Sequence, residues 1–213
     1  MPQDLTPADF ERLDELVCRS RKVSRGDTLC RQGDAFRNLY AIKAGAFKTV
    51  ITLRDGREQV TGFHIAGEPL GLDGIHSSAH TADAVALEDG MLCIIPFGRL
   101  ERLCGEMRVM QRHVHRLMSG EIVRASQWMT LLGSMRAEER VSAFLLNLSE
   151  RLRALNHAHL EFKLRMSREE IGSYLGMTLE TVSRMLSRFQ DDKLIEVRGK
   201  LIRILDVERL QRV

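Results

Sequence analysis

The chain has 213 residues, of which 44% are hydrophobic and 29% are charged, and its formal net charge is +3 at pH 7. This composition is typical of a globular protein with one large or two modest domains. No apolar run approaches the roughly 18 residues that a transmembrane helix needs, and the first residues lack the regions of a signal peptide. The sequence therefore predicts a cytoplasmic protein outside the membrane, and it excludes a basic tail as a source of nucleic-acid affinity.

The N-terminal half predicts a short helix followed by a β-rich domain. Residues 6–17 have a helical pattern, with Thr6 as a possible N-cap and Pro7 at the first helical position. Residues 23–96 carry many short apolar and β-branched runs without a helical period. Glycine and Asp-Gly pairs, which favour turns and hairpins, interrupt these runs at Gly45, Asp55-Gly56 and Asp89-Gly90. This pattern predicts a β-roll of the jelly-roll type.

Residues 107–133 predict one long helix with an apolar stripe. Apolar or small residues recur at alternating steps of four and three, which is the heptad pattern of a coiled coil, at Met118, Ile122, Ala125, Met129 and Leu132. A helix of this length outgrows a small domain, so its stripe needs a partner. Packing on its own domain is the alternative, but we prefer a two-fold dimer through this helix.

Residues 166–190 contain two short helical patterns that are joined by a tight turn. Ser167 and Glu170 form a capping box, which predicts a helix that continues to Leu175. Gly176 suits the left-handed residue that ends this helix, and Thr178 can cap the next one. A short helix, a glycine-containing turn and a second helix make a helix-turn-helix unit.

The second of these helices has one apolar and one polar face. Its inner face carries Val182, Met185, Leu186 and Phe189. The polar face carries residue types that read DNA, because Arg can pair with guanine and Glu can accept from the amino group of cytosine. Residues 193–205 then predict a wing of two strands around Gly199, whose cations could reach phosphates. The predicted DNA-binding residues are Thr178, Glu180, Ser183, Arg184, Arg188, Arg198 and Lys200. A solvated helical hairpin is the alternative, but the cap, turn, polar face and wing together favour binding to double-stranded DNA.

This order of elements resembles the Crp–Fnr superfamily of bacterial transcription regulators, and it is most similar to the Fnr (anaerobic regulator) branch. The similar stretches are LYAIKAGAFKT, EQVTGFHIAGEPLG, RLMSGEI, AEERVSAFLLNLS and SREEIGSYLGMTLETVSR. The resemblance implies an α+β fold with three parts. These are a β-roll sensor domain at residues 1–106, a dimerisation helix at residues 107–133, and a winged helix-turn-helix domain at residues 134–213.

The resemblance also implies a function. A homodimer would bind a palindromic TTGAT-type operator, with Arg184 on a guanine and Glu180 facing a cytosine, and would control oxygen- or redox-responsive genes. The hairpin at residues 54–57 resembles a surface through which Fnr-like activators contact RNA polymerase, although a simple exposed hairpin is the alternative.

The signal that the roll senses is left open. Superfamily members that bind cyclic AMP use a Gly-Glu pair for the ribose and an Arg-Ser/Thr-Ala run for the phosphate. Gly67-Glu68 is present here, but His80-Thr81-Ala82 stands in place of the second run. A mostly neutral histidine is a poor substitute for a guanidinium group on phosphate. Cyclic AMP is therefore not expected.

Fnr proteins hold a [4Fe–4S] cluster through three N-terminal cysteines and one cysteine of the roll, and Cys93 matches the roll ligand. The other three positions have no match, and one thiolate cannot hold a cluster that four normally ligate. We therefore expect no cofactor in this sequence, and a cluster only if a segment with cysteines precedes Met1. Cys30 and Cys104 are expected to be packing residues, and Cys18 is the only other thiol considered as a ligand.

Two further interpretations stay open. A regulator without a cluster could respond to haem, nitric oxide or another small effector. A cupin-like metalloenzyme is the alternative from another class, because a jelly roll can hold a metal. It needs a His-x-His set with a further Glu and His, whereas the roll offers only the scattered His64, His76 and His80. An enzyme also leaves the winged helix without a role, so no catalytic residue is expected.

Overall fold

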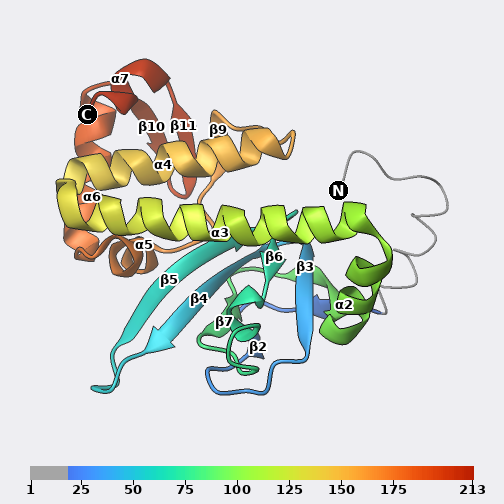
Figure 1. Ribbon diagram of the computed structural model, residues 1–213. Helices are drawn as coiled ribbons and strands as arrows, with labels where there is room; N and C mark the ends of the chain where they lie inside the picture. Colours follow the sequence, from blue (N-terminus) through green and yellow to red (C-terminus); the bar gives the residue numbers. More distant parts are fainter. Residues whose placement is uncertain (1–18) are drawn as a thin grey trace. The chain divides into compact units, whose positions relative to one another are not determined.

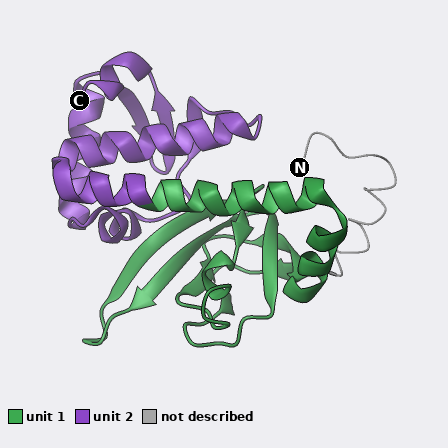
Figure 2. Ribbon diagram, viewed as in Figure 1, with its two compact units in different colours: residues 1–125 green, residues 126–213 purple. Residues whose placement is uncertain are grey.

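The computed structural model describes residues 19–213, so the helix expected at residues 6–17 lies outside the described part of the chain. The chain forms two compact units, and the boundary between them in the sequence falls between residues 125 and 126 (Figure 2). Each unit is described by itself below. None of the described helices is both long and apolar enough to cross a membrane.

The first unit contains the predicted β-roll (Figure 1). Its strands are β1 (Arg19–Val23), β2 (Thr28–Cys30), β3 (Asn38–Ala44), β4 (Ala46–Thr52), β5 (Glu58–Ile65), β6 (Pro69–Leu70), β7 (Asp83–Ala86) and β8 (Gly90–Pro96), with the 3₁₀ helix η1 (Leu72–Gly74) between β6 and β7. They form two sheets, with strand orders β1-β8-β3-β6 and β2-β7-β4-β5, in which neighbouring strands are antiparallel. Residues from both sheets make one apolar cluster, in which Phe47 and Leu92 are fully buried. Removing side chains of this kind costs several kcal/mol, about 3–5 for Phe to Ala.

The hairpin predicted at Asp55-Gly56 is confirmed. It joins β4 to β5, and the Leu53 N–H donates to the Arg57 carbonyl at 2.8 Å. The Arg57 guanidinium pairs with the Asp55 carboxylate at 2.7 Å, and both side chains are more than half exposed.

Two helices follow the roll, α2 (Phe97–Glu106) and α3 (Arg108–Ser134). α2 was not predicted from the sequence; it is short and buries only Leu100 and Leu103. These two residues pack with Leu39 of the roll and with Met107 and Met110 near the start of α3. α3 has 27 residues, or about 40 Å at 1.5 Å per residue, and its bounds agree with the predicted helix at residues 107–133.

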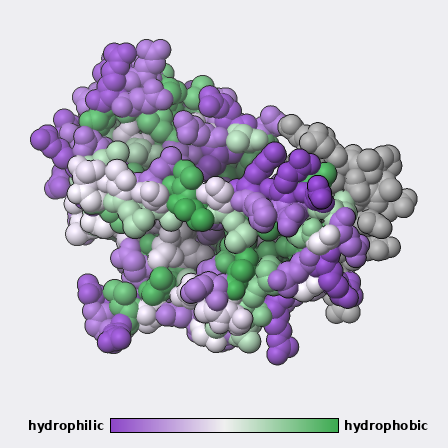
Figure 3. Space-filling model, viewed as in Figure 1, coloured by the Kyte–Doolittle hydropathy of each residue, from purple (hydrophilic) through white to green (hydrophobic). Residues whose placement is uncertain are grey.

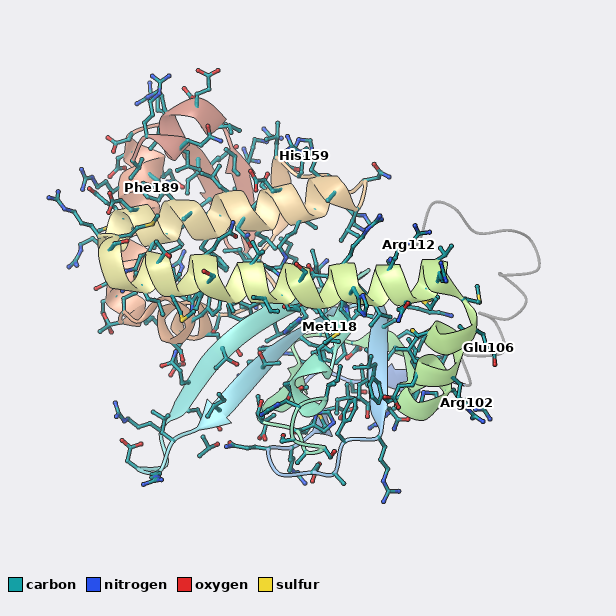
Figure 4. The ribbon with its side chains drawn as sticks, viewed as in Figure 1. Arg102, Glu106, Arg112, Met118, His159 and Phe189 are labelled. Carbon is teal, nitrogen blue, oxygen red and sulfur yellow. The ribbon has the colours of Figure 1, made fainter. Side chains whose placement is uncertain are left out.

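The second unit holds the end of α3 and the predicted winged helix-turn-helix. Its elements are α4 (Ala137–Ala154), β9 (Glu161–Lys163), α5 (Arg168–Leu175), α6 (Leu179–Asp191), β10 (Ile195–Arg198), β11 (Leu201–Ile204) and α7 (Val207–Gln211). The strand order β10-β11-β9 adds one strand to the predicted hairpin, with Phe162 opposite Ile202. Phe189 of α6, labelled in Figure 4, is buried in this unit. The predicted helix and wing bounds are confirmed, whereas β9 is too short for its sequence to have indicated it.

Candidate nucleic-acid interface

The turn between α5 and α6 is built as the sequence predicts. The Ser167 N–H donates to the Glu170 carboxylate at 2.6 Å, and the Glu170 N–H donates to the Ser167 hydroxyl at 3.1 Å. Gly176 ends α5 in the left-handed region with φ of 63°. Gly172 is needed for a second reason, because a Cβ atom there would lie 2.6 Å from the Met177 carbonyl oxygen. The two helices can therefore approach closely only with glycine at this position.

The cap and the buried face of α6 fix how this helix presents its outer residues. The Thr178 hydroxyl accepts from the Thr181 N–H at 3.3 Å, which makes Thr178 the N-cap. The inner residues predicted from the sequence are all buried: Val182, Met185, Leu186 and Phe189. On the opposite side Glu180 and Arg184 are exposed and Ser183 is half-buried. The structure thus brings the three predicted base-reading residues to one face at the N-terminal end of α6.

Glu180 and Arg184 carry opposite charges on this face. Hydrogen bonds from its own backbone amide and from the Thr178 hydroxyl hold the pKa of Glu180 below its ordinary value. An ionised carboxylate can only accept hydrogen bonds, so Glu180 suits a donor such as an amino group. Arg184 Nη2 lies 3.5 Å from Thr181 Oγ1, at the long limit for a hydrogen bond. This weak contact leaves the guanidinium group able to turn toward a ligand.

The remaining predicted cations lie beside carboxylates. Arg188 forms an ion pair with Glu138 of α4 and lies 3.9 Å from Asp192. In the wing, Arg198 pairs with Glu196 at 2.6 Å. Lys200 is exposed at the turn between β10 and β11. A small cavity between α5, α6 and the wing is lined by Arg168, Leu186, Ser187, Gln190, Val197 and Gly199. Sequence reasoning missed Arg168 and Gln190 here, although Arg168 directly follows the capping serine.

The stripe predicted for the dimer lies along α3. Ile122 and Met129 are 70% and 66% exposed, Met118 is 37% exposed, and Ala125 is exposed. Leu132 is half-buried. Figure 3 shows hydrophobic side chains that interrupt the hydrophilic surface over α3, and Figure 4 labels Met118 on this helix. Large apolar side chains that share one exposed face are typical of an interaction surface.

Glu68, Thr81 and His80 of the roll lie within hydrogen-bond or ion-pair distance of other residues of the first unit. Glu68 is 9% exposed, accepts from the Ile65 N–H at 3.0 Å, and lies 3.3 Å from an Arg124 nitrogen of α3. The Thr81 N–H and hydroxyl donate to Asp73 at 2.7 and 3.2 Å. His80 Nδ1 lies 3.4 Å from the same carboxylate group. Glu68, His80 and Thr81 could be picked out in the sequence, but their partners Arg124 and Asp73 could not, because they come from other segments.

The described cysteines do not form a metal site. Cys30 and Cys93 are buried, and Cys104 is half-buried. Burial raises the pKa of Cys30 to about 12 and also raises the pKa of Cys104, so both remain protonated thiols near neutral pH. Residues 19–213 contain no group of three or more Cys, His, Asp or Glu that could hold a metal ion. Cys18 lies outside the described residues, and the described residues do not provide the four thiolates of a cubane cluster.

Two known domain families match most of the chain. Residues 20–107 match the cyclic nucleotide-binding domain, and residues 139–213 match the Crp-like helix-turn-helix domain. A roll of this type joined to a DNA-binding unit defines a transcription regulator.

Relatives that match along nearly the whole chain identify the family. The chain is 44% identical to the transcriptional regulatory protein btr of Bordetella pertussis, over all of this chain and 88% of that protein. It is 45% identical to the transcriptional activator protein Anr of Pseudomonas protegens, over 97% and 84% of the two chains. It is 41% identical to the fumarate and nitrate reduction regulatory protein of Yersinia pestis, over 99% and 84%. The solved structure of FixK2 from Bradyrhizobium japonicum has a TM-score of 0.84 and 30% identity, and covers 91% of this chain and 96% of that one.

The chain belongs to the Crp/Fnr family of transcription regulators and matches its Fnr branch. The predicted fold, the resemblance and the role as a DNA-binding regulator are confirmed by these similarities. The relatives are regulators rather than enzymes, so the cupin-like metalloenzyme interpretation is set aside.

Proposed function

We propose that the chain acts in the cytoplasm as a homodimer that binds a palindromic TTGAT-type operator. The observation that supports this most is that Glu180 and Arg184 are exposed beside the half-buried Ser183 on one face of a helix whose cap and preceding turn are formed. Relatives are named for fumarate and nitrate reduction and for electron transport, which supports targets among redox-responsive respiratory genes.

Each residue of the interface has a proposed role. Arg184 would donate two hydrogen bonds to guanine, and Glu180 would accept from a cytosine amino group. Ser183 can donate or accept beside them. The Thr178 hydroxyl and the cations at 188, 198 and 200 would contact phosphates, which sets the register of α6 in the major groove but carries no base preference.

The test of base recognition uses Arg184→Ala. We expect a loss of discrimination of about 1–3 kcal/mol at one base pair, measured by fluorescence anisotropy with the operator and with a duplex changed at that guanine. Arg153→Ala is the control, because Arg153 is an exposed arginine of α4 outside this face. Equal affinity of wild type and Arg184→Ala for both duplexes would reject the assignment.

The homodimer is proposed to form through the stripe on α3. In a two-fold pairing each seam residue meets its own copy, so an acidic residue there would repel its mate. Ala125 carries no charge, and we therefore expect dimers at micromolar concentration with little help from an effector. Sedimentation of wild type, Ala125→Asp and the off-seam control Gln127→Asp tests this. A monomeric wild type contradicts the proposal.

We propose that the roll does not bind cyclic AMP. The contacts that support this are Arg124 on Glu68 and Asp73 on Thr81, since a nucleotide would have to displace both. Titration calorimetry with cyclic AMP should therefore give no saturable heat, and a micromolar affinity would overturn the claim.

We also propose that the 213-residue chain carries no stable iron–sulfur cluster, because the described thiols do not fit one. Iron and sulfide analysis of protein purified without oxygen tests this, and about four irons per chain would show that the thiols ligate after all. Haem binding is the second candidate for sensing, and absorbance of the same sample would reveal it.

RNA polymerase is the proposed protein partner, and the β4–β5 hairpin is the proposed contact. The paired and exposed Asp55 and Arg57 side chains give this hairpin a defined polar tip. Substituting both residues with alanine should lower promoter activation without changing operator affinity. Unchanged activation would leave the hairpin as a simple connection between strands.

A further inference from the structure

Arg140 of α4 binds the ends of two other helices. Its Nη2 donates to the carbonyl of Leu132 in the last turn of α3 at 2.7 Å, and its Nε donates to the carbonyl of Met135, the residue directly after α3, at 2.9 Å. Its Nη1 donates to the carbonyl of Leu175, the last residue of α5, at 3.1 Å. All of these residues belong to the second unit.

These carbonyls are groups that a helix cannot satisfy by itself. The last four carbonyls of an α-helix have no partner within the helix, and the C-terminal end carries a partial negative charge that favours a cation. One guanidinium group supplies donors and charge to two such ends at once. Its planar fork holds several acceptors in fixed directions, which an ammonium group does not do.

A ring stack joins the same two helices at a second point. The rings of Trp128 on α3 and Tyr174 on α5 lie nearly parallel, with centroids 3.6 Å apart and an angle of 13°. Phe144 of α4 meets Tyr174 edge-on at 6.0 Å. With Arg140, this stack fixes the direction of α5 relative to the last turns of α3. α5 leads directly into α6 through the tight turn at Gly176, so the direction of α6 follows.

We propose that Arg140 and the Trp128–Tyr174 stack form a joint that sets the spacing of the two reading helices in the dimer. This inference rests on the proposed function. If α3 pairs with its two-fold mate, the angle between α3 and α5 determines how far apart the two copies of α6 lie. Two half-sites one turn of DNA apart require a separation of about 34 Å. Arg140 is therefore a positioning residue, which need not touch DNA.

The test measures spacing preference rather than affinity alone. The probes are duplexes with the two half-sites at the natural spacing, one base pair closer and one base pair farther apart, together with a duplex that has a single half-site. For Arg140→Lys we expect about a tenfold loss at the natural spacing, which corresponds to ~1.4 kcal/mol. The affinities of this variant for the three spacings should become similar to one another, whereas wild type should prefer the natural spacing. Its affinity for the single half-site should equal that of wild type. Arg153→Lys makes the same exchange at an exposed site on the same helix and should behave as wild type.

Tyr174→Leu provides an independent variant, since it removes the stack and keeps Arg140. It should flatten the spacing preference in the same way. Since Tyr174→Leu changes the surroundings of Trp128, far-UV circular dichroism and its thermal unfolding curve report whether each variant remains folded.

Two results would overturn the joint. One is a wild-type spacing profile in both Arg140→Lys and Tyr174→Leu. The other is an equal loss on the single half-site, which would mean that these residues support the fold of the reading unit rather than its placement. A wild type that does not prefer the palindrome over a scrambled duplex would instead reject the proposed function.

Discussion

Replacing Gly172 with alanine should separate the effect of the tight turn from ordinary helix propensity. A Cβ atom at this position would lie 2.6 Å from the Met177 carbonyl oxygen, whereas ordinary contact begins at 3.4 Å. The turn would have to move by the difference, 0.8 Å, and overpacking of this kind costs about 1–3 kcal/mol or more. Alanine returns up to ~1 kcal/mol of helix propensity. Because the atoms nearest to the added Cβ are all backbone atoms, the cost should lie at the upper end of this range, which leaves a net loss of about 2 kcal/mol in the free energy of unfolding of the second unit.

Gly133→Ala is the matched control. Gly133 lies in α3, in the same unit, and a Cβ atom there would meet nothing within 4 Å. This variant should be neutral or stabilised by at most ~1 kcal/mol. Urea unfolding followed by Trp128 fluorescence measures both variants, and anisotropy should also show weaker operator binding for Gly172→Ala because the start of α6 moves with the turn. Equal stability of the two variants would refute the reasoning.

Three further predictions concern other contacts. Arg124→Gln should lower the stability of the first unit by ~1–2 kcal/mol, because it removes the cation beside the buried Glu68. The loss should not be larger, because the Arg124 side chain is 34% exposed and solvent weakens its ion pair. Urea unfolding checks this, and a double-mutant cycle with Glu68→Gln should show the coupling between the two residues. Thr178→Ala should cost about 1 kcal/mol by removing the N-cap of α6, while Thr178→Ser should restore it; thermal unfolding of both variants is the measurement. Cys30, with its pKa raised from 9.0 to about 12, should resist iodoacetamide at pH 8 in the folded protein and react in urea. Because the fold favours the neutral thiol, the stability linked to Cys30 is fully present below pH 9 and is lost as the pH rises toward 12. Labelling of Cys30 itself in the native protein at pH 8, located by peptide mass spectrometry, would contradict this.

The helix-turn-helix could be predicted from the sequence because its signals are local. Ser167 caps α5 through a residue three positions away, Gly176 ends it, and Thr178 caps α6 through a residue three positions away. The buried face of α6 repeats at helical intervals. Neighbours along the chain therefore determine this part of the site.

The contacts that hold these elements together could not be predicted in the same way. Arg140 and Leu175 are 35 positions apart, and Arg124 and Glu68 are 56 positions apart. An arginine in a helix pattern is normally assigned to the solvent-exposed face, and only the fold shows which carbonyl or carboxylate it meets. β9 was missed for the same reason, since its three residues become a strand through pairing with β11.

The ion pairs around the reading unit have a consequence for how salt affects DNA binding. Counterions leave DNA when a cation neutralises a phosphate, and the number released sets the slope of affinity against salt. Arg188 is paired with Glu138, Arg198 with Glu196, and Arg203 with Glu161. A carboxylate beside a guanidinium group offsets part of its positive charge, so each of these arginines gains less from contact with a phosphate than an unpaired arginine would. Binding to random sequence should then be weak and short-lived, and residence on DNA should depend on the bases that Arg184 and Glu180 recognise.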